Sequence, residues 1–402
     1  MTTSDPDQEF LEEWEKFAAA PDFLEGVDLG PSTLEAHLAS SDISYEQHRR
    51  QKEMECADLI AARRSFYLDT RFWIHLRDAD LGKSVRPVYN QLLGELRKGV
   101  AEGRIVCPFA ADLLAEVYKQ SDPTTRVATA RLIDELSLNI SLQSEPERLA
   151  TELLHGIQAV RQNAPRQESL KRLVWTCSSF AVGHAMPSFP AYDAATELAL
   201  QKSFLDAISH LGFAHQLLGE EDAHDRPEEF NEMWAELAER LNKLNVENAK
   251  ESKPRKQIEK EEFSGALEAY LPVLRNVIRQ IFVSEFQMEP HAATEAEFER
   301  AASQIGGMIV EAFRLGRLRG SFPTFSIRAG LATAVRWDQK RKYKPNDFHD
   351  FGHAAAALPY FDVFATERSL KHLLVSDLKF DERFSTAVEC DPEAILSLAK
   401  TT

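Results

Sequence analysis

Residues 65–70 read SFYLDT, a short apolar run that ends in an acid and a threonine, and this stretch decides the fold. Such a run is typical of a buried strand. Two further short runs follow helical patterns along the chain, GRIVCPF at 103–109 and LNISLQ at 138–143. Strands that alternate with helices predict a parallel sheet with crossover helices. The sequence therefore indicates an α/β domain that starts near residue 65.

A block of long helical patterns without a fixed repeat period interrupts this α/β pattern from about 145 to 335. The α/β pattern then returns, with a predicted helix at 346–359, a strand at 363–368 (VFATER) and a last strand at 373–377 (LLVSD). Because surface loops tolerate insertions, we expect one α/β domain split by a helical insertion. The predicted parts are a helical N-terminal extension (1–64), a first α/β part (65–144), the insertion (145–335), and a second α/β part with the C-terminal tail (336–402).

The chain has 402 residues, with 47 Lys and Arg against 64 Asp and Glu, and a net charge of -17. Binding that coats nucleic acid depends on basic residues, so this balance disfavours such a role but leaves room for a nucleic-acid enzyme with a local basic patch. No apolar run reaches the length of a membrane span. The acidic N-terminus lacks a secretory pattern, and the four cysteines are too scattered for a disulfide framework or a CxxC metal site. We therefore expect a reduced, cytoplasmic protein without a membrane partner.

Acidic residues fall where the predicted strands end. Asp69 closes the first strand, Glu116 lies on the helix after the second, and Glu367 closes the fourth. Asp347 and Asp350 are three residues apart, so they share one face of their predicted helix. Ligands of open α/β sheets bind at the carboxyl ends of the strands. If the strands are parallel neighbours, these acids converge on one place.

A cluster of carboxylates either has raised pKa values or holds a cation. Oxygen ligands suit Mg²⁺ and Mn²⁺, which activate water for phosphodiester hydrolysis. Ordinary roles stay open beside this one: Asp69 and Asp347 could cap helices, and Glu116 could be an exposed helix acid. His349 and His353 are four residues apart, as in the HExxH zinc helix, but Asp350 takes the place of the Glu, which makes a zinc hydrolase the weaker alternative.

Four segments, in this order, resemble the motifs of PIN-domain nucleases. They are Tyr67-Leu68-Asp69-Thr70, the run from Pro108-Phe109-Ala110 to Glu116, the stretch NDFHDFGHAAAALPY at 346–360, and Asp362-Val363-Phe364-Ala365-Thr366-Glu367. The resemblance covers about 65–143 and 345–380. It implies a five-stranded parallel sheet, a divalent metal and endoribonuclease activity, with Asp69, Glu116, Asp350 and Glu367 as catalytic residues and Asp347 as a further metal ligand. Arg71 and Glu367 depart from the family pattern, which usually has a small polar residue and an Asp at these places.

Other residues are expected to support this site. Thr70 and Thr366 could orient water or phosphate, and Asp362 and His353 could assist the ligands. The densest basic run, 336–344 (RWDQKRKYK), precedes the acidic helix and carries two aromatic residues on which bases could stack. The predicted nucleic-acid contacts are Trp337, Lys340, Arg341, Lys342 and Lys344; a solvated lysine-rich loop is the alternative.

Three functions follow in order of preference. The first is a divalent-metal-dependent endoribonuclease that binds Mg²⁺ or Mn²⁺ and takes RNA as its substrate. The second is a catalytically weak or inactive PIN-like module that binds nucleic acid or protein, with the helical insertion as a surface for a protein partner. The third is a wholly helical scaffold whose strands are wrongly assigned. A homo-oligomer is left open. The chain has no Walker A, GxGxxG or GxSxG motif, which disfavours NTP-driven motors, dinucleotide oxidoreductases and α/β-hydrolases.

Overall fold

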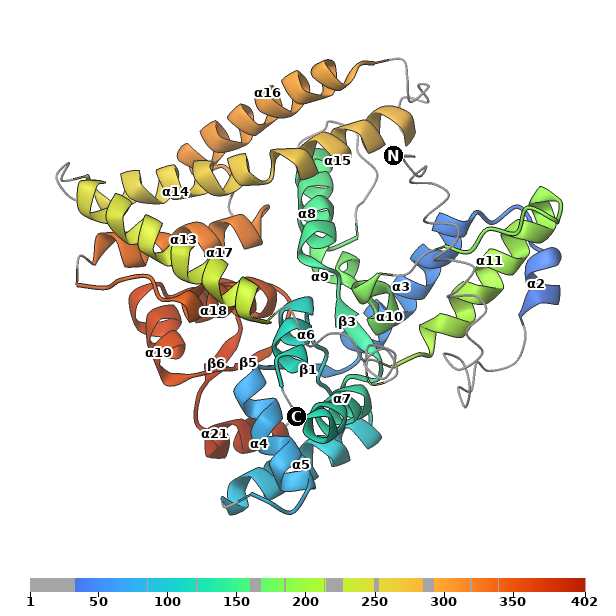
Figure 1. The fold of residues 1–402 in the computed structure, drawn as a ribbon, viewed down its shortest axis with the longest axis horizontal. Coiled ribbons are helices and arrows are strands. Elements are labelled where there is room, and N and C mark those ends of the chain that lie inside the picture. Colours follow the sequence, from blue (N-terminus) through green and yellow to red (C-terminus); the bar gives the residue numbers. More distant parts are fainter. Residues whose placement is uncertain are drawn as a thin grey trace, which may run out of the picture.

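The computed structural model describes most of the chain from residue 33 onward, and the strands it contains exclude a wholly helical scaffold. The described residues are 33–84, 86–120, 122–159, 168–183, 186–212, 214, 227–248, 253–284, 293–318, 320–338 and 340–401. The predicted α/β class is confirmed, since helices surround a small parallel sheet (Figure 1). None of the described helices is long and apolar enough to span a bilayer.

Four parallel strands form the central sheet in the order β2-β1-β5-β6. They are β1 (Arg64–Leu68), β2 (Ile105–Val106), β5 (Val363–Ala365) and β6 (Ala387–Glu389). Phe66 pairs with Val363 and Leu68 with Ala365. The two separated α/β stretches of the sequence therefore meet at the centre of one sheet, although the whole helical block lies between them in the chain.

The strand β1 is buried on both faces, which explains its unbroken apolar run. Phe66 and Leu68 enter one core and Tyr67 enters another, because successive side chains of a strand point to opposite faces. Helices cover both faces, as is usual for parallel sheets. The first core is formed with α4 (Thr70–Asp80), α5 (Pro87–Ala101), α7 (Pro123–Ser137) and α21 (Pro392–Lys400). The second is formed with α17 (Pro323–Trp337) and α18 (Pro345–Ala357).

The predicted fifth parallel strand is not confirmed. The stretch at 138–143 does form a strand, β3 (Ile140–Leu142), but its ladder is antiparallel to β4 (Trp175–Cys177), which the sequence patterns missed. One parallel bridge, between Phe109 and Ser141, links β3 to the chain that continues β2. The hairpin therefore adjoins the sheet at its β2 edge.

The last predicted strand, LLVSD at 373–377, is wrong. The segment forms a π-helical turn, η3 (His372–Asp377), which continues the short helix α19 (Arg368–Lys371). Leu373 and Leu374 are both buried, as consecutive positions on the inner face of a helix can be. A short apolar run does not by itself distinguish a strand from a buried helical turn. The fourth sheet strand is instead β6, after α20 (Phe380–Phe384); it is short and half-exposed at the sheet edge.

The helical block builds a third core around α8 (Glu145–Ala159), α14 (Arg255–Ala269), α15 (Leu271–Ser284) and α16 (Glu295–Arg314). The helix α17 belongs to two cores, because Phe325 and Ala329 face the third core while Ile327 and Leu331 face the sheet. The boundary predicted between 335 and 336 thus falls inside α17. The long helix α13 (Pro227–Asn248) lies against α18 (Figure 1).

The N-terminal helices pack as part of the folded protein. The helices α2 (Leu34–Leu38) and α3 (Tyr45–Ala61) lie beside α11 (Ala194–Ser209) in Figure 1. Cys56, Ala57 and Ile60 of α3 are buried in the same core as β4. The remaining elements are α6 (Ala111–Tyr118), α9 (Leu170–Leu173) and α10 (Ser178–Val182).

Candidate active site

Two of the predicted acidic ligands lie at the carboxyl ends of the two central strands, and the others lie on α6 and α18. Asp69 follows β1, and Thr366 and Glu367 follow β5. The Asp69 amide donates to the Ala365 carbonyl over 3.1 Å, which holds the two strand ends together. From β1 the chain crosses to β2 on one side, whereas β5 leads to β6 on the other. Open α/β sheets bind ligands at such a change of direction.

Asp69 caps a helix, which is one of the roles that the sequence left open, and it interacts electrostatically with Glu116 and Asp350. Its carboxylate accepts from the Phe72 amide at the start of α4, over 3.3 Å, and from the Thr366 hydroxyl. Burial raises the pKa of Asp69 to about 6, with repulsion from Glu116 adding to the rise, although the charge of His353 and these hydrogen bonds oppose it. Asp69 is thus a buried carboxyl group that takes up a proton near neutral pH.

Glu116 is held by its contacts on two sides. The Thr70 hydroxyl donates to its carboxylate, and His353 Nε2 donates to the same carboxylate over 3.3 Å. The other ring nitrogen of His353, Nδ1, lies 2.6 Å from the Tyr67 hydroxyl. Burial alone would raise the pKa of Glu116, but His353, together with His349 and Lys119, lowers it below its ordinary value.

His353 supplies a buried positive charge to the site. Burial alone would lower its pKa, but the hydrogen bond to Glu116 and the charges of Glu116, Asp112 and Asp69 raise the pKa of His353 to about 9. Its ring is therefore protonated at neutral pH. His353 lies between the acids and Tyr67, and this position is compatible with the supporting role that the sequence predicts.

Asp350 is the most perturbed acid of α18. Burial and the nearby negative charges of Glu367, Asp347 and Asp69 raise the pKa of Asp350 to about 7, against the opposing charge of His353. Asp347 lies at the start of α18, where its carboxylate accepts from the Lys344 amide over 3.0 Å. Glu367 accepts from the Ser369 hydroxyl. The acids from β1, α18 and the end of β5 therefore share one electrostatic environment.

Sequence reasoning missed Asp112 at this site. A Cβ atom added to Gly352 of α18 would lie 2.7 Å from Asp112 Oδ1, so the carboxylate sits directly against that helix. Its charge acts on both Tyr67 and His353. Asp112 precedes Glu116 by four residues, and this spacing puts both acids on one face of α6. That signal was available in the sequence.

Asp362 does not join this group. It precedes β5, at the end of the strand opposite to Glu367, and accepts from the Ser65 amide over 2.8 Å and from Lys171 over 2.9 Å. Burial would raise the pKa of Asp362, but these contacts with Ser65 and Lys171 lower it. Its role is to join the amino ends of β1 and β5.

The basic run lies on the connection between α17 and α18. Lys340, Lys342 and Lys344 are exposed, and the side chain of Trp337 is 50% exposed. Arg341 is half-buried. Tyr343, which the sequence offered as a second stacking platform, is buried and stacks on Phe348 instead.

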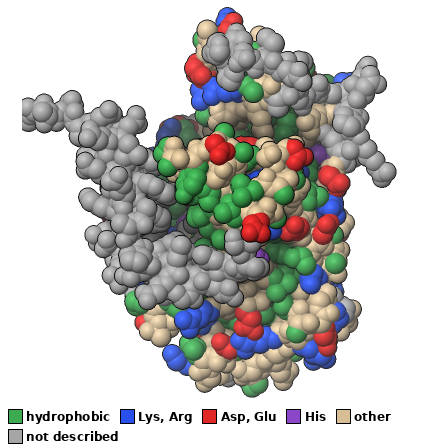
Figure 2. Space-filling model, turned by 90° about the vertical axis from the view of Figure 1, so that its right-hand side faces the viewer, with side chains coloured by type: hydrophobic (Ala, Val, Ile, Leu, Met, Phe, Trp, Pro, Cys, Tyr) green, Lys and Arg blue, Asp and Glu red, His purple; other side chains and the backbone are tan. Residues whose placement is uncertain are grey.

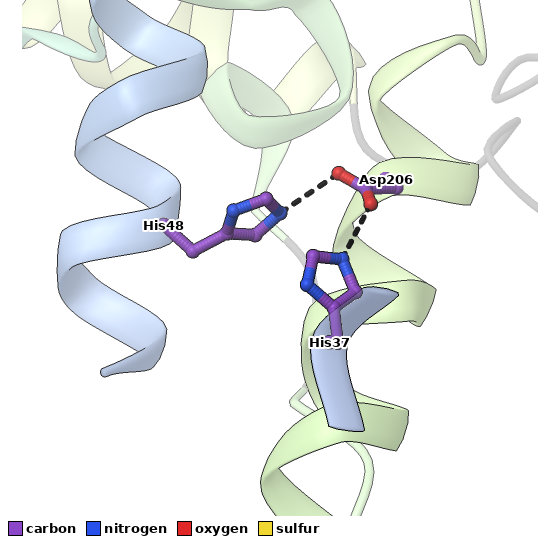
Figure 3. A group of neighbouring side chains, drawn as sticks. All are labelled: His37, His48 and Asp206. Atoms are coloured by element: carbon purple, nitrogen blue, oxygen red, sulfur yellow. Dashed lines mark hydrogen bonds and ion pairs between the residues drawn. The ribbon is translucent and has the colours of Figure 1, made fainter. Parts of the chain in front are cut away.

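Among the described residues, only one group of three His, Cys, Asp or Glu brings all its ligand atoms within 4.8 Å of one another, and it lies elsewhere. It consists of His37, His48 and Asp206, which are buried together beside α11 (Figure 3). No three of the described acids at the ends of β1 and β5 have ligand atoms that lie within 4.8 Å of one another. No local pattern signals the buried group, because its members come from three separate helices.

Comparisons with family models, with curated proteins and with solved structures found no match for this chain. The function is therefore inferred from the geometry of the site.

Proposed function

We propose that the protein is a divalent-metal-dependent endoribonuclease with a PIN-like site at the carboxyl ends of β1 and β5. The observation that carries this proposal is that Asp69, Asp350 and Glu367 come to one edge of the sheet, where burial and the charges of neighbouring acids raise the pKa values of Asp69 and Asp350 toward neutrality. Such a group of buried acids is costly without a cation, so it is typical of a metal site.

In this proposal Asp69, Glu116 and Asp350 hold the metal, with Glu367 and Asp347 as further ligands. A bound Mg²⁺ or Mn²⁺ supplies an activated water and offsets the charge of the phosphate. Thr70 and Thr366 already donate to Glu116 and Asp69, so their part is to orient these carboxylates. Asp112, which lies against Gly352 of α18, adds a further negative charge to this group.

The strand order supports the resemblance to PIN domains. If β3 is counted through its single bridge, the order becomes β3-β2-β1-β5-β6, a five-strand arrangement centred on β1. The acids then lie beside the central pair of strands, where this class of sheet binds its ligands.

RNA is the proposed substrate because the exposed basic run leads into the acidic helix. Lys340, Lys342 and Lys344 would contact the phosphate backbone, together with Arg341, and the exposed ring of Trp337 would stack on a base. The chain's net negative charge makes this local run the natural contact with a polyanion.

The test is cleavage of single-stranded RNA with Mn²⁺ by the parent protein and by the variants Asp69→Asn and Asp350→Asn. We expect each variant to lose at least about 100-fold in rate, because a lost ligand weakens metal binding and water activation. Asp58→Asn, at an exposed position paired with Arg172, is the matched control and should cleave like the parent. Equal activity of the parent and the two site variants would reject the assignment.

One observation favours the second function, a PIN-like module without turnover. The protonated His353 already provides a cation among Asp69, Asp112 and Glu116, so the protein partly balances this charge by itself. In such a module Mn²⁺ would shift the melting temperature of the parent no more than that of Asp350→Asn, whereas a functional metal site gives the parent the larger shift by mass action. The same samples used for the cleavage assay decide between the two.

A further inference from the structure

The group His37, His48 and Asp206 joins three helices of the N-terminal side. His37 Nε2 lies 2.7 Å from Asp206 Oδ2, and His48 Nε2 lies 2.8 Å from Asp206 Oδ1. Figure 3 shows the two rings, from α2 and α3, pointing at different oxygens of the one carboxylate on α11. The ring centroids are 4.6 Å apart with a near-perpendicular tilt. Three ligand atoms therefore converge on one small volume.

These side chains are withdrawn from solvent, because each residue is at most 9% exposed. Figure 2 shows the face on the right-hand side of Figure 1, where histidine is visible only as small spots among acidic, basic and apolar side chains. Burying a carboxylate and two imidazoles costs free energy unless a charged partner lies beside them. Burial would raise the pKa of Asp206, but the hydrogen bonds from His48 and His37 and the charge of Lys52 lower it.

Surrounding contacts fix the segment that carries both histidines. Lys202 of α11 is fully buried, and its ammonium donates to the carbonyls of Ser40 and Ile43, over 2.8 and 3.1 Å. These carbonyls belong to the short connection between α2 and α3. The positions of His37 and His48 relative to Asp206 are thus held by a second set of contacts, as is usual around metal ligands.

The distances fit a modest adjustment on metal binding. Tetrahedral zinc with bonds of about 2.0–2.1 Å separates its ligand atoms by roughly 3.3 Å. One carboxylate oxygen would be the ligand, so the nitrogen now hydrogen-bonded to that oxygen would move away from it by about half an ångström. The ligand atoms of the three residues already lie within 4.8 Å of one another. Lys52, whose ammonium lies 3.2 Å from Asp206 Oδ1, has a second acid in reach, Glu55 at 3.7 Å. The Lys52 ammonium can therefore move away from Asp206 and keep Glu55 as its charged partner.

We propose that His37, His48 and Asp206 form a Zn²⁺ site that fastens α2 and α3 to α11. Two imidazoles and one carboxylate are a common zinc ligand set, and the fourth position would be taken by water. This site differs in chemistry from the all-oxygen group at the sheet, and it does not depend on the proposed nuclease function.

The thiols of Cys56 and Cys177 are alternative zinc ligands, so a test must distinguish them from the two histidines and Asp206. Cys56 lies two turns after His48 on α3, and its Sγ is 3.7 Å from Cys177 Sγ of β4. Both thiols are buried, and the hydrogen bond with Cys177, followed by burial, raises the pKa of Cys56. A raised pKa disfavours the thiolate that zinc needs.

The experiment is a calorimetric titration of the chelator-treated full-length protein with Zn²⁺, with a Co²⁺ absorption spectrum as the spectroscopic probe. We expect one tight equivalent at this site, counted in the Asp350→Asn background so that the acidic group at the sheet does not contribute. Asp206→Asn and His48→Gln should weaken this binding by at least about 100-fold, because each removes a ligand. His210→Ala, an exposed histidine at the end of α11, and Cys56→Ser are matched controls and should bind like the parent.

Several outcomes would overturn the site. These are no stoichiometric Zn²⁺ binding by the parent, parent-like binding by Asp206→Asn, or loss of binding in Cys56→Ser. Circular dichroism checks the folding of each variant, and if both ligand variants are unfolded, the parent titration and its Co²⁺ spectrum decide. The Asp350→Asn variant should keep full Zn²⁺ binding, which separates this site from the acidic group.

Discussion

The unusual residue of the acidic site is Asp350, since it is a carboxyl group whose pKa rises to about 7 through burial and through the charges of Glu367, Asp347 and Asp69. A carboxyl group whose pKa is raised on folding makes the folded state less stable as pH rises. The penalty is absent below the ordinary pKa near 4 and is complete above about 7. A metal ion would remove it, which links stability to the proposed function.

Replacing Asp350 by Asn should therefore stabilise the metal-free protein at pH 8, by roughly 2 kcal/mol, and should make little difference at pH 4. Urea unfolding in the presence of a chelator measures this difference. Asp338→Asn, an exposed acid before α18, is the control and should show no such pH dependence. A variant less stable than the parent at pH 8 would show that Asp350 makes favourable contacts instead.

The positive charge of His353 offsets part of the negative charge of these acids. Its pKa of about 9 means that its favourable contribution is complete below its ordinary value near 6.5 and is lost as pH rises through 9. Both residues therefore make the folded state less stable as pH rises, Asp350 between about pH 4 and 7 and His353 between about pH 6.5 and 9. The sequence offered His353 as a supporting residue, but its contacts with Tyr67 and Glu116 depend on three separate elements.

At the level of the elements, close packing holds α8 against the start of α17 inside the helical block. A Cβ atom added to Gly156 of α8 would lie 2.5 Å from the ring of Phe322, the buried residue just before α17. Gly265, in the middle of α14, is exposed and has no atom within 4 Å of such a Cβ. An alanine side chain at position 156 would therefore meet the Phe322 ring, whereas one at position 265 would meet no neighbouring atom.

Substituting both glycines by alanine tests this packing. Gly265→Ala should stabilise the protein by about 0.5–1 kcal/mol, because alanine is the better helix former. Gly156→Ala gains the same preference but forces the Phe322 ring aside, so we expect a net loss of roughly 1–2 kcal/mol. Urea unfolding of the two variants beside the parent gives both values. Equal stabilisation by the two would mean that α8 and α17 are not in close contact.

At the scale of the whole molecule, a buried network joins the insertion to the sheet domain. Glu152 of α8 is fully buried and accepts from the Thr324 amide of α17 over 3.1 Å, from the Thr324 hydroxyl, and from the Tyr360 hydroxyl before β5 over 2.6 Å. Burial raises the pKa of Glu152, against these hydrogen bonds and the charge of Arg148. The network crosses from one core to another.

Glu152→Gln should cost roughly 2 kcal/mol, because the glutamine amide group can no longer accept from all three donors and one buried donor loses its partner. The measurement is the free energy of unfolding in urea. Glu236→Gln, at an exposed position of α13, is the control and should match the parent. A neutral effect of Glu152→Gln would indicate that the carboxyl group is protonated and donates a hydrogen bond of its own.

Local sequence patterns predict the apolar strands β1 and β5, the acid after each, the helical block between them, and the α/β class. These follow from the periodicity and chemistry of neighbouring residues. Long-range packing selects β6 as the edge strand and makes the apolar run at 373–377 the helical turn η3. It also places His353 between Tyr67 and Glu116, and it brings His37, His48 and Asp206 together. Such pairings depend on contacts between distant segments, and a local pattern carries no information about the partner that a buried side chain will find.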